Sequence, residues 1–276
     1  MTTKRKKIAF CGSAGSFSEI AVKKLFPDGE RIPSGSFKEA YAKTVRGETD
    51  ATVLPLENSY AGEVATVADE LYKGSLFVQD VCAMKVVQNL IGVKGSSLSS
   101  IKTVVSHPQA LSQCADFITA HGYRELSSEN TAFAAKAVAE AGDKTMAAIA
   151  SKDCAEAYGL CVLAEDIAAT SENATRFAVL EKERPNYREN DQLILLFAVK
   201  DESGALASSL SVIADHGYNL KSIHSRPLKE KAWHYYFYAE AERPSGTASE
   251  DALLADMEKH CTGVKIAGRF GPNRTI

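Results

Sequence analysis

Hydroxyl and amide side chains recur where predicted strands give way to predicted helices, and this pattern indicates a site for a small anion. Ser16 and Glu19 have the spacing of a capping box, and Ser106 and Gln109 repeat it with glutamine. Three further junctions carry the same residue types: Asn58-Ser59, Asn130-Thr131 and Ser151. One explanation is that each residue only caps its helix. The alternative is that several helix N-termini gather at the carboxyl ends of the strands, where free N–H groups favour an oxygen-rich, negatively charged ligand.

A second polar group, Asn173-Ala-Thr-Arg-Phe177, stands where an apolar strand is predicted to begin. Asn173-Ala174-Thr175 has the form of a glycosylation acceptor, but that use requires a secreted chain. The six cysteines have no zinc-like spacing and mostly lie in apolar stretches, which indicates buried free thiols of a cytoplasmic protein. The sequence therefore favours a different role for these side chains.

The motifs of cofactor- and metal-dependent enzymes are missing from the sequence. There is no complete GxGxxG after the first predicted strand, no P-loop and no HExxH, and the six histidines lack metal-ligand spacing. We therefore expect no cofactor and no metal. The net charge of -3 does not indicate a basic surface for binding nucleic acid or a membrane. The longest apolar run has only the length of a strand, far less than a membrane span. An enzyme of this kind would work by positioning, hydrogen-bond donation and electrostatics.

The elements that must position these side chains alternate between short β-branched runs and helical patterns over the first 180 residues. Helices are indicated by apolar spacings of three and four, as at Val64, Val67, Ala68 and Leu71. Strands are predicted at 7–11, 51–54, 86–93, 103–105, 146–150 and 176–180. This alternation predicts an α/β fold.

A polar stretch at 181–192 that contains Pro185 predicts a linker, and the tail beyond it has a different organisation. The tail is predicted to form strands at 193–199, 218–226, 232–240 and 264–269, with helices at 204–216 and 247–260. Thr247-Ala-Ser-Glu250 has capping-box spacing at the start of the second helix. The order βαββαβ is that of a ferredoxin-like domain.

Taken in order, these motifs resemble those of the prephenate dehydratase family with an ACT regulatory domain. The segments that carry the resemblance are 12–19, 54–59 with Gly62, 106–114, 148–151 leading to 158–160, 173–177, 204–206 and 217–227. The resemblance implies a two-lobed catalytic domain like a type II periplasmic binding protein at 1–182, with lobes at roughly 1–85 plus 165–182 and at 86–164. It also implies a linker at 183–191 and a ferredoxin-like ACT domain at 192–276.

The resemblance implies that the chain removes water and CO2 from prephenate to give phenylpyruvate, in L-phenylalanine biosynthesis and under feedback regulation by L-phenylalanine. It implies a cytoplasmic homodimer joined through ACT domains, assembled further into a homotetramer. We expect no chorismate mutase segment, because the first predicted strand begins at Lys7. Two alternatives remain open: an arogenate dehydratase, whose substrate has an amino group in place of the ketone, and a non-catalytic amino-acid sensor.

The family motif places Thr175 at the departing hydroxyl, where we expect it to act as a positioned donor. Glu57, Asn58 and Gln113 are the other residues assigned to catalysis, with Glu57 orienting Asn58 or Gln113. Residues expected to bind the substrate are Ser16, Ser59, Ser106, Gln109, Thr131, Arg176 and Phe177. Because adjacent strand residues face opposite sides, Arg176 is left open between a ligand contact and a structural tie. Gln113 could instead face solvent, and Phe177 could be core or a wall against the ring.

The effector motifs imply a second site in the tail, for L-phenylalanine. Its expected residues are Gly204, Ala205, Leu206, Asn219, Leu220, Ser225, Arg226 and Pro227. Two positions depart from the family pattern. Ala169 replaces a frequent acidic residue, and His224 replaces the glutamate that usually precedes Ser-Arg-Pro. Since histidine titrates near neutral pH, His224 leads us to hypothesise pH-dependent regulation.

Overall fold

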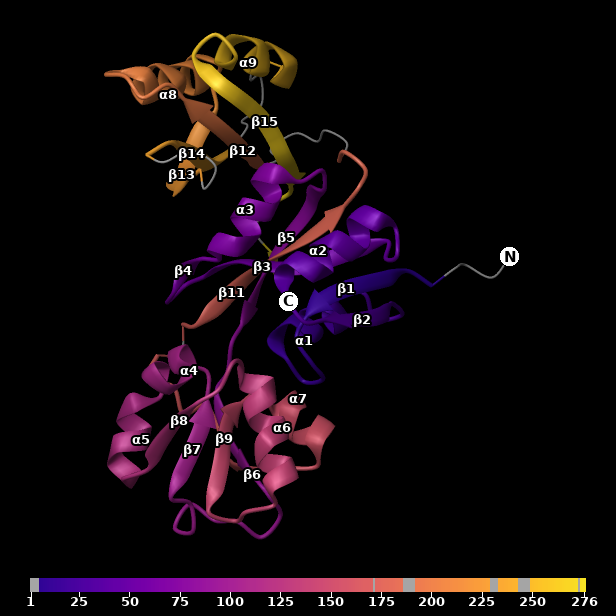
Figure 1. The fold of residues 1–276 in the computed structure, drawn as a ribbon, viewed down its shortest axis with the longest axis vertical. Helices are drawn as coiled ribbons and strands as arrows, with labels where there is room; N and C mark the ends of the chain where they lie inside the picture. The colour runs from indigo at the N-terminus through magenta and orange to yellow at the C-terminus, as the bar shows by residue number, and fades with distance from the viewer. Residues whose placement is uncertain (1–4, 171, 186–191, 229–232, 243–248, 273) are drawn as a thin grey trace. The chain divides into compact units, whose positions relative to one another are not determined.

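The computed structural model describes residues 5–170, 172–185, 192–228, 233–242, 249–272 and 274–276, and its helices and strands form the mixed α/β fold that the sequence predicts (Figure 1). The described chain divides into two compact units. The first draws on Met1–Val67, Cys82–Phe177 and Thr275–Ile276, and the second on Ala68–Val81 and Ala178–Arg274. None of the helices in these described ranges is both long enough and apolar enough to cross a membrane.

The first unit contains a parallel arrangement built around its first strand, which pairs with a neighbour on each side. The elements are β1 (Lys7–Cys11), α1 (Phe17–Leu25), β2 (Glu30–Ser34), α2 (Phe37–Arg46), β3 (Ala51–Asn58) and β4 (Gly62–Glu63). Ile8, Ala9 and Phe10 are all buried, so β1 is covered on both faces, as its continuous apolar sequence requires. Strand β4 pairs with the last residues of β3, Glu57 and Asn58, and so fixes the end of that strand.

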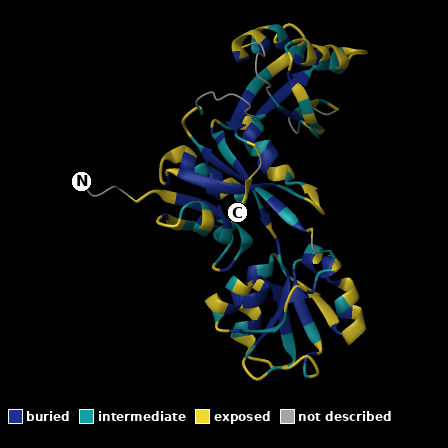
Figure 2. Cartoon of the chain, turned by 180° about the vertical axis from the view of Figure 1, so that it is seen from behind, coloured by how far each residue is buried: buried dark blue, intermediate teal, exposed yellow. Residues whose placement is uncertain are grey.

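A second, five-stranded sheet in the same unit has the order β10-β6-β9-β7-β8. Its elements are β6 (Asn89–Gly92), β7 (Thr103–Ser106), α4 (Pro108–Gln113), α5 (Ala115–His121), β8 (Arg124–Ser127), α6 (Thr131–Ala141), β9 (Met146–Ala150), α7 (Lys152–Tyr158) and β10 (Cys161–Ala164). Alternate strand residues enter two separate cores. Val104 packs with residues of α4 and α5, whereas Val105 packs with residues of α6 and α7. Helices therefore cover both faces of this sheet, whose central strands β6, β9 and β7 are largely buried in Figure 2.

One helix and two long strands have residues in both units. They are α3 (Ala65–Lys73), β5 (Phe77–Lys85) and β11 (Ala174–Glu181). In the second unit, β5 pairs in parallel with β15 at Val78 and Gly268. A Cβ at Gly268 would lie only 2.4 Å from the Cβ of Val78, so this close approach depends on glycine.

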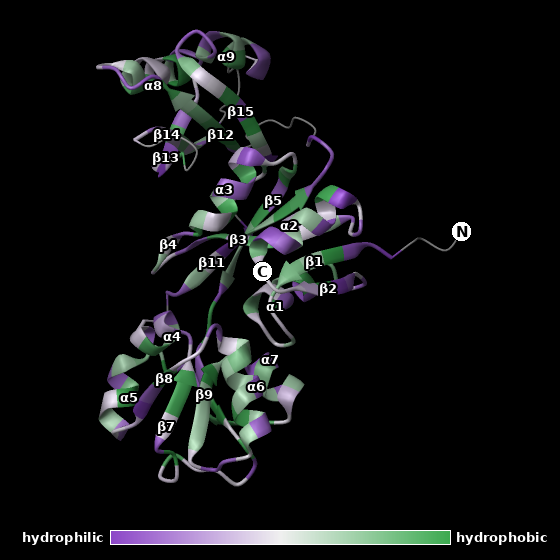
Figure 3. Ribbon diagram, viewed as in Figure 1, coloured by the Kyte–Doolittle hydropathy of each residue, from purple (hydrophilic) through white to green (hydrophobic). Residues whose placement is uncertain are grey.

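The rest of the second unit has the predicted order βαββαβ. Its elements are β12 (Gln192–Val199), α8 (Ala205–Asp215), β13 (Asn219–Pro227), β14 (Tyr235–Glu242), α9 (Glu250–Met257) and β15 (Cys261–Phe270). The short β16 (Arg274–Thr275) has one residue in each unit. The strands lie in the order β13-β14-β12-β15. Leu195 and Phe197 of β12, Ile213 of α8 and Leu253 of α9 meet in one core, so both helices pack on the same face of the sheet. Strand β12, which lies in the middle of this sheet, is mainly hydrophobic in Figure 3.

The sequence predicted strands 7–11 and 146–150 with their observed bounds, and most other strands within a few residues. Strand β6 is shorter than the predicted 86–93, and β2, β4, β5, β8, β10 and β16 were not predicted. The proposed linker lies partly, at 186–191, outside the described residues, as do 247 and 248 of the second capping box. The predicted start of this helix is wrong by two residues. Ser249 is the N-cap, its Oγ accepts from the backbone N–H of Ala252 at 3.2 Å, and Glu250 is the first residue of α9 rather than the capping-box partner of residue 247.

The predicted helix starts are partly correct. Ser16, Asn130 and Ser151 are N-caps whose side chains accept a backbone N–H of the first turn. The cap predicted at Ser106 is wrong. Pro108 is the first residue of α4, so the preceding His107 becomes the cap, and its Nδ1 accepts from the backbone N–H of Gln109 at 3.2 Å. Asn58-Ser59 begins no helix and lies instead at the end of β3.

Candidate active site

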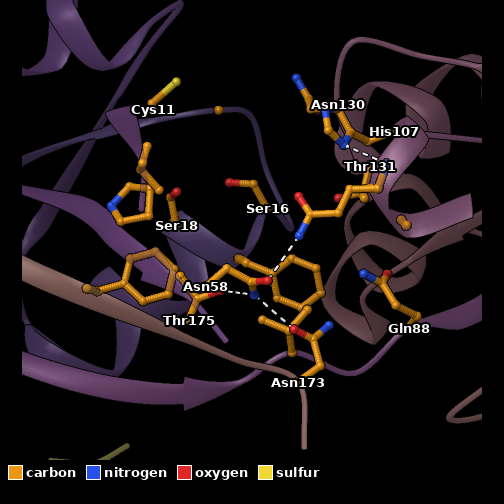
Figure 4. A pocket seen from close by; sticks show the side chains of 18 of the residues that line it. Cys11, Ser16, Ser18, Asn58, Gln88, His107, Asn130, Thr131, Asn173 and Thr175 are labelled. Carbon is orange, nitrogen blue, oxygen red and sulfur yellow. Dashed lines mark hydrogen bonds between the residues drawn. The ribbon is translucent and has the colours of Figure 1, made fainter. Parts of the chain in front are cut away.

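A cavity of about 380 Å³ lies in the first unit, where strand ends and helix starts from both of its sheets meet (Figure 4). Aromatic and aliphatic side chains form part of its wall: Phe17, Phe37, Pro55, Val64, Val86 and Phe177. The remaining side chains are small or carry hydroxyl, thiol, amide or imidazole groups. Along this cavity, in the described part of the chain, no Asp, Glu, Lys or Arg contributes to the lining. Any charge on a ligand must therefore be balanced by dipoles and hydrogen bonds.

Asn58 is the centre of the hydrogen-bond network in the cavity. Its Oδ1 accepts three hydrogen bonds of 3.0 Å, from the backbone N–H groups of Tyr60 and Ala61 and from Nε2 of Gln109. Three donors on one atom identify that atom as the oxygen, so the orientation of the amide is fixed by its surroundings. The nitrogen of Asn58 must consequently point to the opposite side, toward β11.

Thr175 receives a hydrogen bond from that nitrogen. Nδ2 of Asn58 lies 3.0 Å from Oγ1 of Thr175, 2.8 Å from Oδ1 of Asn173 and 3.1 Å from the carbonyl of Ala174. Thr175 is 9% exposed and lines the cavity. Because Asn58 can only donate at this position, Oγ1 is the acceptor, and the proton of the threonine hydroxyl is available to a second group.

Three further amides continue the network away from Thr175. Nδ2 of Asn173 donates to Oε1 of Gln113 at 2.9 Å, and Nε2 of Gln88 donates to the same oxygen at 3.4 Å. Gln113, for which helix solvation was an alternative, is buried and turned into the cavity wall. In Figure 4, Thr175 and Gln88 lie on opposite sides of Asn58. The network thus extends across the cavity.

Two helices of more than two turns begin at the cavity. Ser16 caps α1, with its Oγ 3.3 Å from the backbone nitrogen of Glu19, and Asn130 caps α6, with its Oδ1 2.8 Å from that of Phe133. Ser16, Asn130 and Thr131 all line the cavity. The positive ends of the two helix dipoles therefore face a space that lacks formal charge, and this arrangement favours an anionic ligand.

Four of the predicted site residues are not among those that line the cavity. Glu57 is the strand neighbour of Asn58, and Arg176 is that of Thr175, so both face the side of the sheet away from the cavity. There Nη1 of Arg176 lies 3.2 Å from Oε2 of Glu57. Ser59 joins β3 to β11, since its Oγ donates to the carbonyl of Glu172 and accepts from the backbone N–H of Ala174, both at 3.0 Å. Ser106 is fully buried, and its Oγ donates to the carbonyl of Ile149 at 2.6 Å.

The structure does bring the other predicted residues together around the cavity: Ser16, Asn58, Gln109, Gln113, Thr131, Thr175 and Phe177. Phe177 is 1% exposed and combines both of its predicted places, core and cavity wall. Six further residues that line the cavity were not predicted as site residues: Cys11, Ser18, Gln88, His107, Asn130 and Asn173. For Asn130 and Asn173 a sequence signal was present, because Asn130 stands at a predicted helix start and Asn173 begins the motif at 173–177.

Cys11 is a half-buried free thiol in the cavity wall. Burial, followed by the nearby carboxylates of Glu39 and Glu129, raises its pKa to about 11. The thiol is therefore protonated at neutral pH and is a poor nucleophile. Among the described residues, no group of three or more His, Cys, Asp or Glu side chains is arranged to hold a metal ion.

The predicted effector residues lie in the second unit. Gly204 has a φ of 83° and begins α8, whose first turn contains Ala205 and Leu206. Asn219 and Leu220 open β13, and Ser225, Arg226 and Pro227 close it. Among the described residues no side chain caps α8. The backbone N–H of Ala205 donates to the carbonyl of Glu202 at 3.2 Å, and the N–H groups that follow it in the first turn have no side-chain cap. His224 is exposed on β13, and its role in pH-dependent regulation stays a prediction.

Arg226 takes part in a small polar cluster with α3. Its Nε lies 3.0 Å from Oδ1 of Asp69, and the hydroxyl of Tyr236 donates to the same oxygen at 2.8 Å. Tyr236 also stacks on Tyr72, with ring centroids 4.0 Å apart. Burial, together with the hydrogen bond to Asp69, raises the pKa of Tyr236, which remains a neutral donor.

Taken together, these features define an α/β protein with a polar cavity suited to a small organic anion. The prephenate dehydratase family model matches residues 8–185. The chain belongs to the prephenate dehydratase family, as its sequence motifs predicted.

Relatives with known names agree with this assignment. The chain is 34% identical over 275 residues to the prephenate dehydratase of Methanocaldococcus jannaschii, a match that covers 96% of this chain and 98% of that protein. It is 32% identical over 280 residues to arogenate dehydratase/prephenate dehydratase 1, chloroplastic, of Arabidopsis thaliana, a match that covers 96% of this chain and 71% of that protein. A solved structure of prephenate dehydratase from Arthrobacter aurescens in complex with L-Phe has a TM-score of 0.87 and 28% identity, covering 96% of this chain and 90% of that one.

Proposed function

We propose that the chain converts prephenate to phenylpyruvate, CO2 and water, with Thr175 as the donor to the departing hydroxyl. The observation that carries this assignment is the 3.0 Å hydrogen bond from Asn58 to Oγ1 of Thr175. It occupies the threonine as an acceptor and leaves its proton for a group in the cavity. Accepting a hydrogen bond also polarises the O–H group and makes it a stronger donor.

The reaction breaks two bonds of the substrate. The electron pair of the bond between the ring and its carboxylate moves into the ring as CO2 leaves, and the electrons of the opposite C–O bond depart with the hydroxyl. The departing oxygen acquires negative charge and takes up a proton to become water, while the ring becomes aromatic. A donor at this oxygen stabilises the charge as it develops, and it contributes most when it is already in position.

The free hydroxyl of a threonine is a weak acid, so Thr175 acts as a fixed donor and passes on a proton supplied through solvent. Asn58 holds it in place, and the three donors on Oδ1 hold Asn58. In this scheme Glu57 has an indirect role. Its pairing with Arg176 joins β3 to β11 directly behind Asn58 and Thr175, and so keeps the two strand ends in register.

The two carboxylates of prephenate would be held by neutral donors and helix ends. Ser16 and Thr131 begin α1 and α6, and Gln109 reaches the cavity from α4. A cavity of about 380 Å³ is large enough for a substrate of this size. Phe177 and the other apolar wall residues would pack against the ring. Ser59, Ser106 and Arg176 support this arrangement from outside the cavity.

The domain plan that fits these features is a two-lobed catalytic domain of the type II periplasmic-binding-protein kind, followed by an ACT domain. Support for the ACT assignment comes from the order βαββαβ and the strand order β13-β14-β12-β15 in the second unit. Because a related structure was obtained with L-Phe, L-phenylalanine is the proposed effector, bound near the uncapped start of α8 and the start of β13. The proposal includes a cytoplasmic homodimer through ACT domains, doubled to a tetramer.

The deciding experiment measures phenylpyruvate formed from prephenate by the purified chain, with and without L-phenylalanine. The proposal expects turnover that L-phenylalanine lowers. If the chain binds L-phenylalanine but leaves prephenate unchanged, it is a sensor and the catalytic assignment fails. If prephenate is consumed and L-phenylalanine has no effect, only the regulatory part fails.

A further inference from the structure

We propose that Gln88 is a specificity-determining residue whose side-chain oxygen accepts a hydrogen bond from an ammonium group on the side-chain arm of the substrate. Resting on the function proposed above, this role would admit arogenate, in which ammonium replaces the ketone of prephenate. Gln88 lines the cavity and is only 3% exposed, yet its Oε1 has no hydrogen-bond partner among the described residues. A buried acceptor without a partner is costly, and a ligand that supplies a donor removes that cost.

The orientation of the Gln88 amide follows from its neighbours. Its Nε2 lies 3.4 Å from Oε1 of Gln113, and that oxygen is identified by the donor Nδ2 of Asn173 at 2.9 Å. Turning the Gln88 amide over would place two carbonyl oxygens against each other. Asn173 is fixed in turn, because its Oδ1 accepts from Asn58. The network therefore leaves Gln88 as an acceptor toward a ligand.

The position of Gln88 matches the shape of the substrate. In prephenate and arogenate the hydroxyl and the side-chain arm are attached to opposite ends of the ring. Thr175 and Gln88 also stand at opposite ends of a chain of hydrogen bonds that runs through Asn58, Asn173 and Gln113. Figure 4 shows Thr175 and Gln88 on opposite sides of Asn58. A ring whose hydroxyl meets Thr175 consequently directs its arm toward Gln88.

Charge favours the same conclusion. Prephenate carries two negative charges, whereas the ammonium of arogenate reduces the net charge to one. No Lys or Arg lines the described cavity, so a dianion loses its hydration without a formal countercharge. The carbonyl of Gln88 stabilises an ammonium group and is unfavourable beside a ketone oxygen, because both are acceptors. The reaction itself is unchanged: arogenate loses CO2 and water and yields phenylalanine.

The test compares kcat/KM for prephenate and arogenate in the wild type, Gln88→Met and Gln88→Glu. The wild type is expected to turn over both substrates. Methionine has a similar volume and no strong acceptor, so Gln88→Met should lower the arogenate-to-prephenate ratio about ten- to hundredfold. Glutamate keeps an acceptor and adds negative charge, so Gln88→Glu should raise that ratio. If Gln88 only packs against its neighbours, each variant should change kcat/KM for prephenate and for arogenate by the same factor.

The matched control is Gln79→Met, the same chemical change in β5 away from the cavity residues, and it should leave the ratio unchanged. Melting temperatures show whether each variant is folded. If Gln88→Met does not fold, Gln88→Glu still tests the role of the Gln88 oxygen. A wild type that consumes prephenate but not arogenate overturns this inference and leaves the proposed function intact. A ratio that stays constant in both Gln88 variants also overturns it. If neither substrate reacts, the proposed function fails first.

Discussion

Replacing Thr175 by valine tests the central contact of the proposed site. The two side chains have nearly the same shape, so the change removes a hydroxyl and little else. Losing one positioned donor to a developing oxyanion costs about 2.7–4 kcal/mol, which lowers kcat roughly a hundred- to a thousandfold. The expected effect lies in kcat, because a donor to the departing oxygen matters most in the transition state.

The same substitution should have little effect on folding. Without the threonine oxygen, Nδ2 of Asn58 still has Oδ1 of Asn173 at 2.8 Å and the carbonyl of Ala174 at 3.1 Å, one acceptor for each of its hydrogens. The free energy of unfolding should therefore fall by no more than about 1 kcal/mol. Urea denaturation measures this value, and phenylpyruvate absorbance gives kcat and KM.

Two further variants separate chemistry from structure. Thr175→Ser keeps the hydroxyl and should retain activity to within about tenfold. Thr52→Val makes the matched change in β3, where the buried Oγ1 donates to the carbonyl of Ala9 at 3.1 Å. It should lower stability by about 1 kcal/mol and leave kcat unchanged. The reasoning is refuted if Thr175→Val retains more than a tenth of the wild-type kcat.

Three other substitutions have defined outcomes. Gly15→Ala would place a Cβ 2.6 Å from the Cα of Cys154 at a φ of 78°, so the free energy of unfolding measured in urea should fall by about 2–4 kcal/mol. Asp69→Asn removes the ion pair with Arg226 and should raise the L-phenylalanine concentration for half-inhibition about fivefold, with uninhibited kcat within twofold; an unchanged inhibition curve contradicts this. Burial lowers the pKa of Lys265 from 10.5 to about 8, so unfolding takes up a proton between about pH 8 and 10.5. The loss of stability caused by burying the charged ammonium group therefore disappears as pH rises through that window. The melting temperature of Lys265→Met should therefore exceed that of the wild type below pH 8, and the difference should shrink toward pH 10.5.

Local sequence signals predicted the helix starts well where one residue type determines them. Ser16 with Glu19 gave the start of α1, although the carboxylate of Glu19 accepts from the backbone N–H of Gly15 at 2.8 Å rather than from that of Ser16. The error at Ser106 also has a local cause. Proline favours the first position of a helix, so Pro108 assigns the cap to His107 and leaves Ser106 in the strand.

Strand alternation was a sound guide to which residues share a face. It indicated that Thr175 and Arg176 point to opposite sides, and the structure places Thr175 in the cavity and Arg176 beside Glu57. The sequence could not identify Glu57 as the partner, because the pairing of β3 with β11 joins residues 119 positions apart. The same limit applies to Gln88, whose contact with Gln113 depends on tertiary packing and leaves no local pattern.

The neutral lining of the cavity has a consequence for how the enzyme responds to salt. Fields from Lys and Arg reach across a Debye length of about 8 Å at physiological ionic strength, and added salt screens them. Amide dipoles and helix ends act over contact distances, where mobile ions do not intervene. The Michaelis constant for substrate should accordingly change little between dilute buffer and concentrated salt, so the chain can bind a dianion without depending on the ionic composition of its surroundings.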